Sequence, residues 1–270
     1  MVSKIFLIAW ITFKDSIRNK ALYGIFFFGL VLFAANIIVT GMFSWEMGKV
    51  AVDVGLSVVS IAGLVTIFFL SINLVSNDLD KKTIYLILSR PVSKFQYILG
   101  KYTGLGLIIL LSSSVLGACA ALSVKVATCN VKAYIPLHFS WPTFFLGLTF
   151  LTLSLLVVLA IALLWVSMTT HPFTAVLLSL FSYFIGQNVE NVKNIITTSK
   201  MFAENPMLIR VTECVSWVFP NLAAFDLKTT AAYGLAVDAA YLMWVAAYGL
   251  SYIGVCLIMT VLIFQRRELA

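Results

Sequence analysis

The chain has 270 residues, of which 61% are hydrophobic and only 11% are charged. Soluble domains carry about 25% charged residues, so this composition excludes an ordinary soluble fold and predicts a protein of the lipid bilayer. The net charge of +7 does not indicate a nucleic-acid partner, because the basic residues flank apolar segments and do not gather on one soluble face.

Residues 1–20 are predicted to form an interfacial helix at the membrane surface. Lys14 and Arg18 interrupt the apolar run, so a cleavable signal peptide is not indicated. The apolar face of this helix is expected to consist of Phe6, Ala9, Phe13 and Ile17.

Six apolar segments are each long enough to cross the hydrocarbon core as a helix, which takes about 20 residues. They are 21–43, 54–76, 104–124, 143–168, 173–190 and 239–264. The fifth segment is short and ends in polar residues, so a re-entrant element is the alternative there. The predicted fold class is all-α: a polytopic membrane protein with six transmembrane helices in a single domain over 1–270.

The distribution of Lys and Arg predicts the orientation of the spans. With the N-terminus in the cytoplasm, eleven basic and four acidic residues fall on the inner side, and seven of each fall on the outer side. Both termini and the segment 77–103 are therefore expected to be cytoplasmic. The outer side carries 44–53, 125–142 and the longer segment 191–238.

The segment 77–103 is an unusually polar, basic stretch between two spans. Asp78 and Asp80 are predicted to begin a short helix, since carboxylates favour the positive end of the helix dipole. Pro91 is predicted to end it.

Ser93 and Gln96 have the capping-box spacing of a second helix, which would run on into the third span. The residues alone leave two interpretations open. The helix pair either lies on lipid head groups, held by its lysines, or offers a docking surface to a soluble protein.

Several of these residues resemble the cytoplasmic segment of type-2 ABC transporter permeases (the ABC-2 family). The similar parts are Asn77–Asp80, Thr83, Leu88–Lys94 and Leu99–Lys101. The late stretch Phe219–Lys228, with the sequence FPNLAAFDLK, resembles the segment before the final span of bacterial members. The resemblance extends over nearly the whole chain, and the permeases of nitrous-oxide-reductase maturation systems are similar in size and layout.

The resemblance implies a non-catalytic membrane subunit of an exporter in the bacterial cytoplasmic (inner) membrane. It also implies a separate ATP-binding subunit, which would hold ATP and Mg²⁺, and a second permease copy or a paralogue. The segment 77–103 would act as the coupling helix, although the family's acidic start often includes Glu where this chain has Asp. The residues implied to contact the ATPase are Asp78, Leu79, Asp80, Thr83, Ile84, Leu88, Ser89, Arg90 and Pro91.

The chain itself carries no GxxxxGK[ST] phosphate-binding motif, because Gly100 and Lys101 are followed by Tyr102 and lack the preceding glycine. Two other function classes stay open. One is an ATP-independent transporter or channel subunit, and the other is a membrane-embedded enzyme or cofactor-assembly factor. An enzyme would need clustered polar residues deep in the spans, and the sequence does not indicate such a cluster.

Asn36 and Asn73 lie within apolar spans, where polar groups are costly in lipid. They are expected to line the transport path or the dimer seam, or else to form interhelical hydrogen bonds. Cys129 and Cys214 fall on the predicted outer side, where a disulfide between them would persist. Whether they pair is left open by the sequence.

The outer segment 191–238 contains a run bracketed by Pro206 and Pro220, in which Leu208, Val211, Val215 and Val218 recur on one helical face. This pattern predicts a short helix. It is interpreted as an outer gate or cap of the spans, with a plain connector as the alternative.

Overall fold

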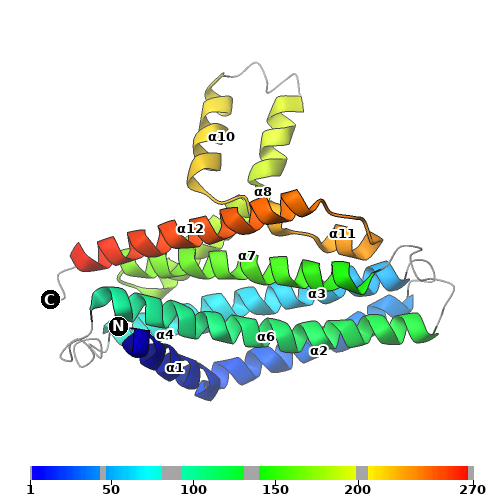
Figure 1. Ribbon diagram of the computed structural model, residues 1–270, viewed down its shortest axis with the longest axis horizontal. Helices are drawn as coiled ribbons and strands as arrows, with labels where there is room; N and C mark the ends of the chain where they lie inside the picture. Colours follow the sequence, from blue (N-terminus) through cyan, green and yellow to red (C-terminus); the bar gives the residue numbers. More distant parts are fainter. Residues whose placement is uncertain (1, 43–46, 81–92, 131–139, 199–205, 267–270) are drawn as a thin grey trace.

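A computed structural model describes residues 2–42, 47–80, 93–130, 140–198 and 206–266. Within these ranges all regular secondary structure is helical (Figure 1). The elements are α1 (Val2–Arg18), α2 (Lys20–Met42), α3 (Met47–Val65), the π-helix η1 (Thr66–Ser71), α4 (Ile72–Asp80), α6 (Lys94–Asn130), α7 (Trp141–Met168), α8 (Pro172–Thr198), α10 (Pro206–Val218), the 3₁₀ turn η3 (Ala223–Phe225), α11 (Lys228–Tyr233) and α12 (Ala239–Arg266).

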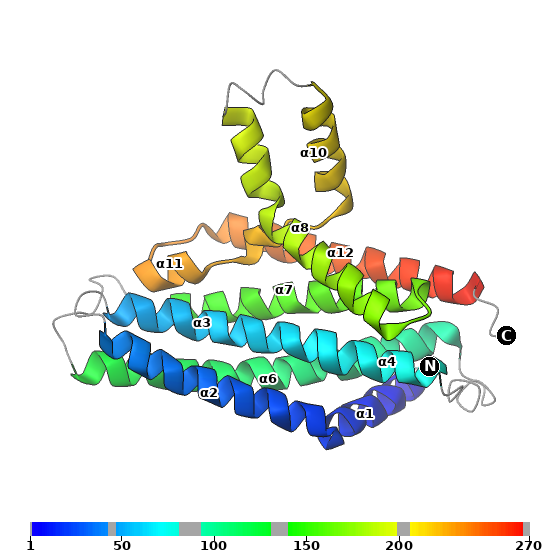
Figure 2. The same ribbon diagram turned by 180° about the vertical axis from the view of Figure 1, so that it is seen from behind.

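The long helices α2, α3–α4, α6, α7 and α12 run side by side in one bundle, and α8 crosses it obliquely (Figures 1 and 2). The two ends of the chain lie at the same end of this bundle. The end of α8 and the whole of α10 form a hairpin that stands away from the other helices. Helix α7 is central, since every residue of 157–163 is buried, as expected for a helix that is apolar on all sides.

Among the described residues, five helical stretches are long and apolar enough to cross a membrane, and α1 with α2, bent by 61°, makes a sixth if the pair is one span. The prediction of an all-helical polytopic membrane protein is therefore confirmed. The helices extend beyond the predicted spans: the second covers Met47–Asp80, the third Lys94–Asn130 and the fifth Pro172–Thr198. Hydropathy marks the lipid-facing part of a helix, whereas polar turns continue it on either side.

The predicted cap at the start of α6 is confirmed. The backbone amide of Ser93 donates to the Gln96 side-chain oxygen over 3.2 Å, and the Gln96 amide donates to Ser93 Oγ over 3.3 Å. This reciprocal pair fixes the first turn of α6. Because α6 then continues without a break to Asn130, its cap is rigidly connected to the third span.

One local prediction was wrong. Asp78 and Asp80 do not begin a helix, because α4 continues from the span and ends at Asp80. Extending a helix that is already formed costs less than starting a new one, so α4 continues to Asp80 although carboxylates favour the beginning of a helix. The residues of the predicted apolar face of α1 have different surroundings: Phe6 is 67% exposed, whereas Ala9 is buried together with Ile8, Thr12 and Ser16.

Two glycines of α6 explain this rotation of α1. A Cβ atom added at Gly100 would lie 2.6 Å from Ile8 Cβ, and one added at Gly104 would lie 2.6 Å from the Ala9 carbonyl oxygen. Small residues at four-residue spacing let two helix backbones approach closely. The small face of α1 therefore packs on α6, and its bulky residues, including Phe6 and Trp10, point outwards.

Candidate functional site

At the end of the bundle where α1 begins, the start of α6 is joined to the end of α12. Lys94 Nζ donates hydrogen bonds to the carbonyl oxygens of Phe264 and Gln265, at 3.2 and 3.3 Å. A cation at this position satisfies the last carbonyls of a helix and complements the negative end of its dipole. The rings of Tyr97 and Phe264 also stack, with centroids 6.1 Å apart.

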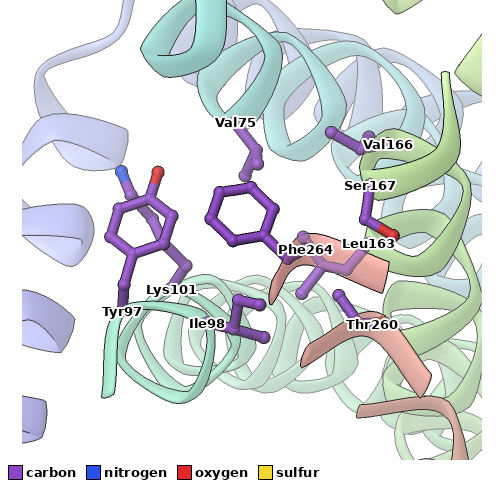
Figure 3. A pocket seen from close by; sticks show the side chains of 9 residues that line it. All are labelled: Val75, Tyr97, Ile98, Lys101, Leu163, Val166, Ser167, Thr260 and Phe264. Atoms are coloured by element: carbon purple, nitrogen blue, oxygen red, sulfur yellow. The ribbon is translucent and has the colours of Figure 1, made fainter. Parts of the chain in front are cut away.

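A small, mostly apolar cavity lies beside this contact (Figure 3). The Phe264 ring sits at its centre, and the buried Lys101 lies next to Tyr97, with Nζ 5.9 Å from the ring centroid. The cavity is lined by Val75, Tyr97, Ile98, Lys101, Leu163, Val166, Ser167, Thr260 and Phe264. These residues come from α4, α6, α7 and α12, so four helices meet where the chain leaves and re-enters the segment 77–103.

The residues implied to contact the ATPase fall into two groups. Asp78, Leu79 and Asp80 belong to the last turn of α4. Thr83, Ile84, Leu88, Ser89, Arg90 and Pro91 lie outside the described residues. The described flanks show that the segment is attached to α4 on one side and to the capped α6 on the other.

Nearer the start of α12, three tyrosines form hydrogen bonds with the motif 219–228 and with Val218, the residue before it. The Tyr252 hydroxyl donates to the Val218 carbonyl over 3.0 Å, and the Tyr241 hydroxyl donates to the Ala224 carbonyl over 3.1 Å. The Tyr248 hydroxyl accepts from the Asn221 amide over 3.0 Å. At spacings of seven and four residues these tyrosines share one face of α12, so they form a ladder along the motif.

The motif is also pressed against α8. The Leu222 amide donates to the Gly186 carbonyl over 3.0 Å, and a Cβ atom added at Gly186 would lie 2.7 Å from the Pro220 carbonyl oxygen. The Asn221 side chain donates to Glu190 over 2.7 Å, while its buried Oδ1 finds no partner among the described residues. The motif therefore connects α8 to α12.

A second pocket lies under this motif, between α3, α7 and α8, and the sequence analysis missed it. Gln187 donates to the Tyr183 hydroxyl over 3.4 Å, and Ser60 of α3 lines the pocket beside them. Ser154 of α7 lines the same space. The only available signal was one polar residue in each of several apolar spans, and the sequence could not show that three helices bring them together.

Asn36 and Asn73 have different surroundings. Asn36 is 1% exposed and its Nδ2 donates to the Ala51 carbonyl at 3.4 Å and to Ser123 Oγ at 3.3 Å, so it links α2 to α3 and α6. Asn73 is exposed on the bundle surface and donates to the Phe69 carbonyl of its own helix over 2.6 Å. It follows the π-helix η1, a type of irregularity that is frequent at functional sites. Roles in the path or the seam remain predictions for both.

The described residues neither test the possible Cys129–Cys214 disulfide nor contain a cluster of metal ligands. Cys214 is exposed on α10, and the Cys129 side chain lies outside the described side chains, so their pairing remains a prediction. In the described part of the chain no three His, Cys, Asp or Glu side chains gather in a way that could hold a metal ion.

The predicted helix bracketed by Pro206 and Pro220 is α10, which begins at Pro206. It packs against α8. Motif 219–228 and α11, not α10, cover the ends of α3 and α7, and Lys49 of α3 lies over the Tyr233 ring of α11, 3.8 Å from its centroid.

Comparison with known proteins agrees with this architecture. No curated protein sequence matches the chain significantly. The family model described as ABC-2 family transporter protein matches residues 6–269, which is nearly the whole chain. The chain therefore belongs to the ABC-2 family, and it is a transporter membrane subunit of the kind that works with an ATP-binding partner.

Proposed function

We propose that this chain is the permease of an ATP-driven exporter in a bacterial inner membrane, and that the ATP-binding subunit docks on the segment 77–103. The observation that carries the proposal, beside the family, is the anchoring of the start of α6, which forms the last part of this segment. The Ser93–Gln96 cap and the Lys94 contact with α12 give the segment a stiff attachment to the bundle.

The proposed mechanism is differential stabilisation of two conformations by the partner. A displacement of the segment reaches α4 and α6 through the chain. It reaches α12 through Lys94, and α12 holds the motif 219–228 through its tyrosines. Closure of the ATPase would in this way move both the inner cavity and the outer motif.

Co-purification from native membranes tests the docking proposal. We expect Arg90→Glu to reduce the recovered ATP-binding subunit about tenfold, because it reverses the charge that the resemblance places at the contact, and Pro91→Ala to weaken the stimulation of ATPase activity. The control is Lys125→Glu, an exposed cation near the end of α6 that lies far from the segment. Undiminished assembly and stimulation in both segment variants would overturn the proposal.

A second copy of the chain, or a paralogue, is proposed to face the α8–α10 hairpin. Val218 at the foot of this hairpin is bonded to Tyr252, which lies about 20 Å along α12 from its first residue at 1.5 Å per residue. A hydrocarbon core about 30 Å thick would place that foot deep in the bilayer.

The hairpin carries charges that lipid would not tolerate at such a depth. Glu190, Lys193, Arg210 and Glu213 are all exposed. Two acids and two bases suit a two-fold contact in which the same surface meets itself. The hairpin is therefore proposed to lie at the seam, where it would face protein and a polar path.

The native Cys214 on α10 offers a test of this seam. In native membranes that have been reduced and then freed of reductant, so that Cys214 is a thiol whether or not it pairs with Cys129, a homobifunctional maleimide is expected to join two chains through Cys214, and Cys214→Ser is expected to abolish the product. Cys119→Ser on α6 serves as the control and should leave the product unchanged. Native mass spectrometry of the purified complex with a single permease chain would contradict the two-copy arrangement, whereas one copy with a paralogue would replace the homodimer.

The similarity to permeases of nitrous-oxide-reductase maturation systems and the direction of transport also stand as proposals. The neighbouring genes give the most direct observation for both. An adjacent ATPase gene supports the class of transporter, and the remaining genes of the cluster narrow the cargo. Transport into inverted membrane vesicles, driven by added ATP, would establish export.

A further inference from the structure

The pocket under the motif 219–228 has a polar lining that the coupling mechanism does not use. Its polar groups come from Ser60, Ser154, Tyr183 and Gln187, and its roof includes Leu222 and Phe225. The open space is about 20 Å³, which is enough for one water molecule. In the conformation described, the pocket is therefore a nearly closed site.

The serine hydroxyls of this pocket lie deep within the membrane-spanning helices. Ser154 is the fourteenth residue of α7 and Ser60 is the fourteenth of α3. Both consequently lie about 20 Å from the outer ends of their helices, close to the middle of a bilayer that α3 and α7 cross. A polar group without a partner is costly there, so a hydroxyl kept at this depth indicates something polar to bind.

Ser154 differs from the neighbouring hydroxyls of its own helix. Thr149 donates to the Phe145 carbonyl and Thr152 donates to the Leu148 carbonyl, so both satisfy themselves on the backbone. Ser154 is only 9% exposed, it lines the pocket, and within the described residues it makes no hydrogen bond. Its hydroxyl is available to an occupant of the pocket.

The charges at the pocket cancel. Lys228 Nζ lies 3.6 Å from Asp226 Oδ2, and the Lys228 amide donates to Asp226 Oδ1 over 3.1 Å. The remaining polar groups are two serine hydroxyls, a phenol and an amide. Such a lining offers both donors and acceptors with no net charge, which matches an uncharged polar group better than an ion.

We propose that this pocket is a midplane subsite for an uncharged hydrogen-bonding group, a hydroxyl or a primary amide, of the transported molecule. Ser60, Ser154 and the hydrogen-bonded Tyr183–Gln187 pair would bind that group after the motif 219–228 lifts from α8. The inference rests on the proposed function in one respect, since it makes the occupant a part of the cargo. The tyrosine ladder of α12 controls how far the motif can lift.

Cysteine accessibility in sealed vesicles of the full chain tests the subsite without needing ATP. Ser154→Cys is compared with Thr152→Cys, which is equally buried on the same helix but does not line the pocket. The probes are neutral 2-hydroxyethyl methanethiosulfonate and its trimethylammonium analogue, and peptide mass spectrometry separates the new thiols from the native ones. We expect the neutral probe to modify Ser154→Cys about tenfold faster than Thr152→Cys, since only the former site opens to a polar pocket.

The neutral probe should also react faster than the charged one at Ser154→Cys, and added erythritol, an uncharged polyol, should slow it. Equal rates for the two variants would overturn the pocket, and faster reaction of the charged probe would overturn the uncharged class. If Ser154→Cys fails to fold, the modification rates are measured at Ser60→Cys on α3 instead. Because the assay needs no ATP-binding subunit, a failure of the docking proposal is detected separately, by co-purification.

Discussion

Helices α1 and α10 both lie at the edge of the bundle and both expose large apolar side chains, yet they are attached in different ways. The α1 backbone is pressed against Gly100 and Gly104 of α6. Helix α10 has its packing contacts with α8 and stands off the bundle with it. Its foot is held by a hydrogen bond from the Tyr252 side chain of α12. Close backbone packing makes a fixed joint, whereas a few side-chain hydrogen bonds make one that can open.

The largest expected effect is that of a substitution at Gly104, where α1 and α6 are in close backbone contact. Gly104→Ala would place a Cβ atom 2.6 Å from the Ala9 carbonyl oxygen, and a backbone atom cannot move aside cheaply. We expect a loss of about 2–3 kcal/mol in the free energy of unfolding, measured by titration with dodecyl sulfate. The same substitution at Gly106 is the control, because its Cβ would meet only Leu156 Cδ2 at 3.4 Å. Equal stabilities of the two variants would show that α1 does not lie against α6.

The α6 joint also shows what a sequence can and cannot predict. The Ser93–Gln96 cap was predictable because both partners lie within one turn of the chain. The rotation of α1 was not, since it depends on two glycines about 90 residues away. The sequence predicted an apolar face shared by Phe6 and Ala9, but it could not show that only Ala9 would pack on α6.

The part of the molecule around the motif 219–228 was the least predictable for the same physical reason. Hydropathy predicted α12 as a span, but it could not assign the three tyrosines their backbone partners 17 to 34 residues away in the chain. The pocket of Ser60, Ser154 and Tyr183 needs three helices to form. Each of these residues alone is an ordinary polar residue in a membrane helix.

A smaller effect is expected at the α10 joint. Tyr252→Phe removes the hydroxyl that donates to the Val218 carbonyl, and a typical hydrogen bond contributes about 1 kcal/mol. We expect faster amide hydrogen exchange in α10 with little change in the rest of the bundle. Tyr102→Phe is the control, because that hydroxyl bonds the Leu156 carbonyl between α6 and α7. Unchanged exchange in α10 would show that the ladder does not hold the hairpin.

The smallest expected effect is a difference in stability between substitutions of the exposed tryptophans of α1 and α10. Trp10 of α1 is 54% exposed and stacks on Phe13 with ring centroids 5.8 Å apart, whereas Trp217 of α10 is 88% exposed. In detergent, Trp10→Ala is expected to cost about 1 kcal/mol and Trp217→Ala less than about 0.5 kcal/mol. Both values come from the same dodecyl sulfate titration, with the unchanged chain as reference.

The same Trp217 variant is also tested in native membranes, where a second copy could contact α10. If α10 faces a second copy, Trp217→Ala should lower the yield of the Cys214 cross-link even though the isolated chain is as stable as before. A loss of stability in detergent would instead show that Trp217 already packs within one chain, and the hairpin would then be a fixed part of the bundle, as α1 is. The two readouts together decide whether the difference between α1 and α10 belongs to the single chain or to its assembly.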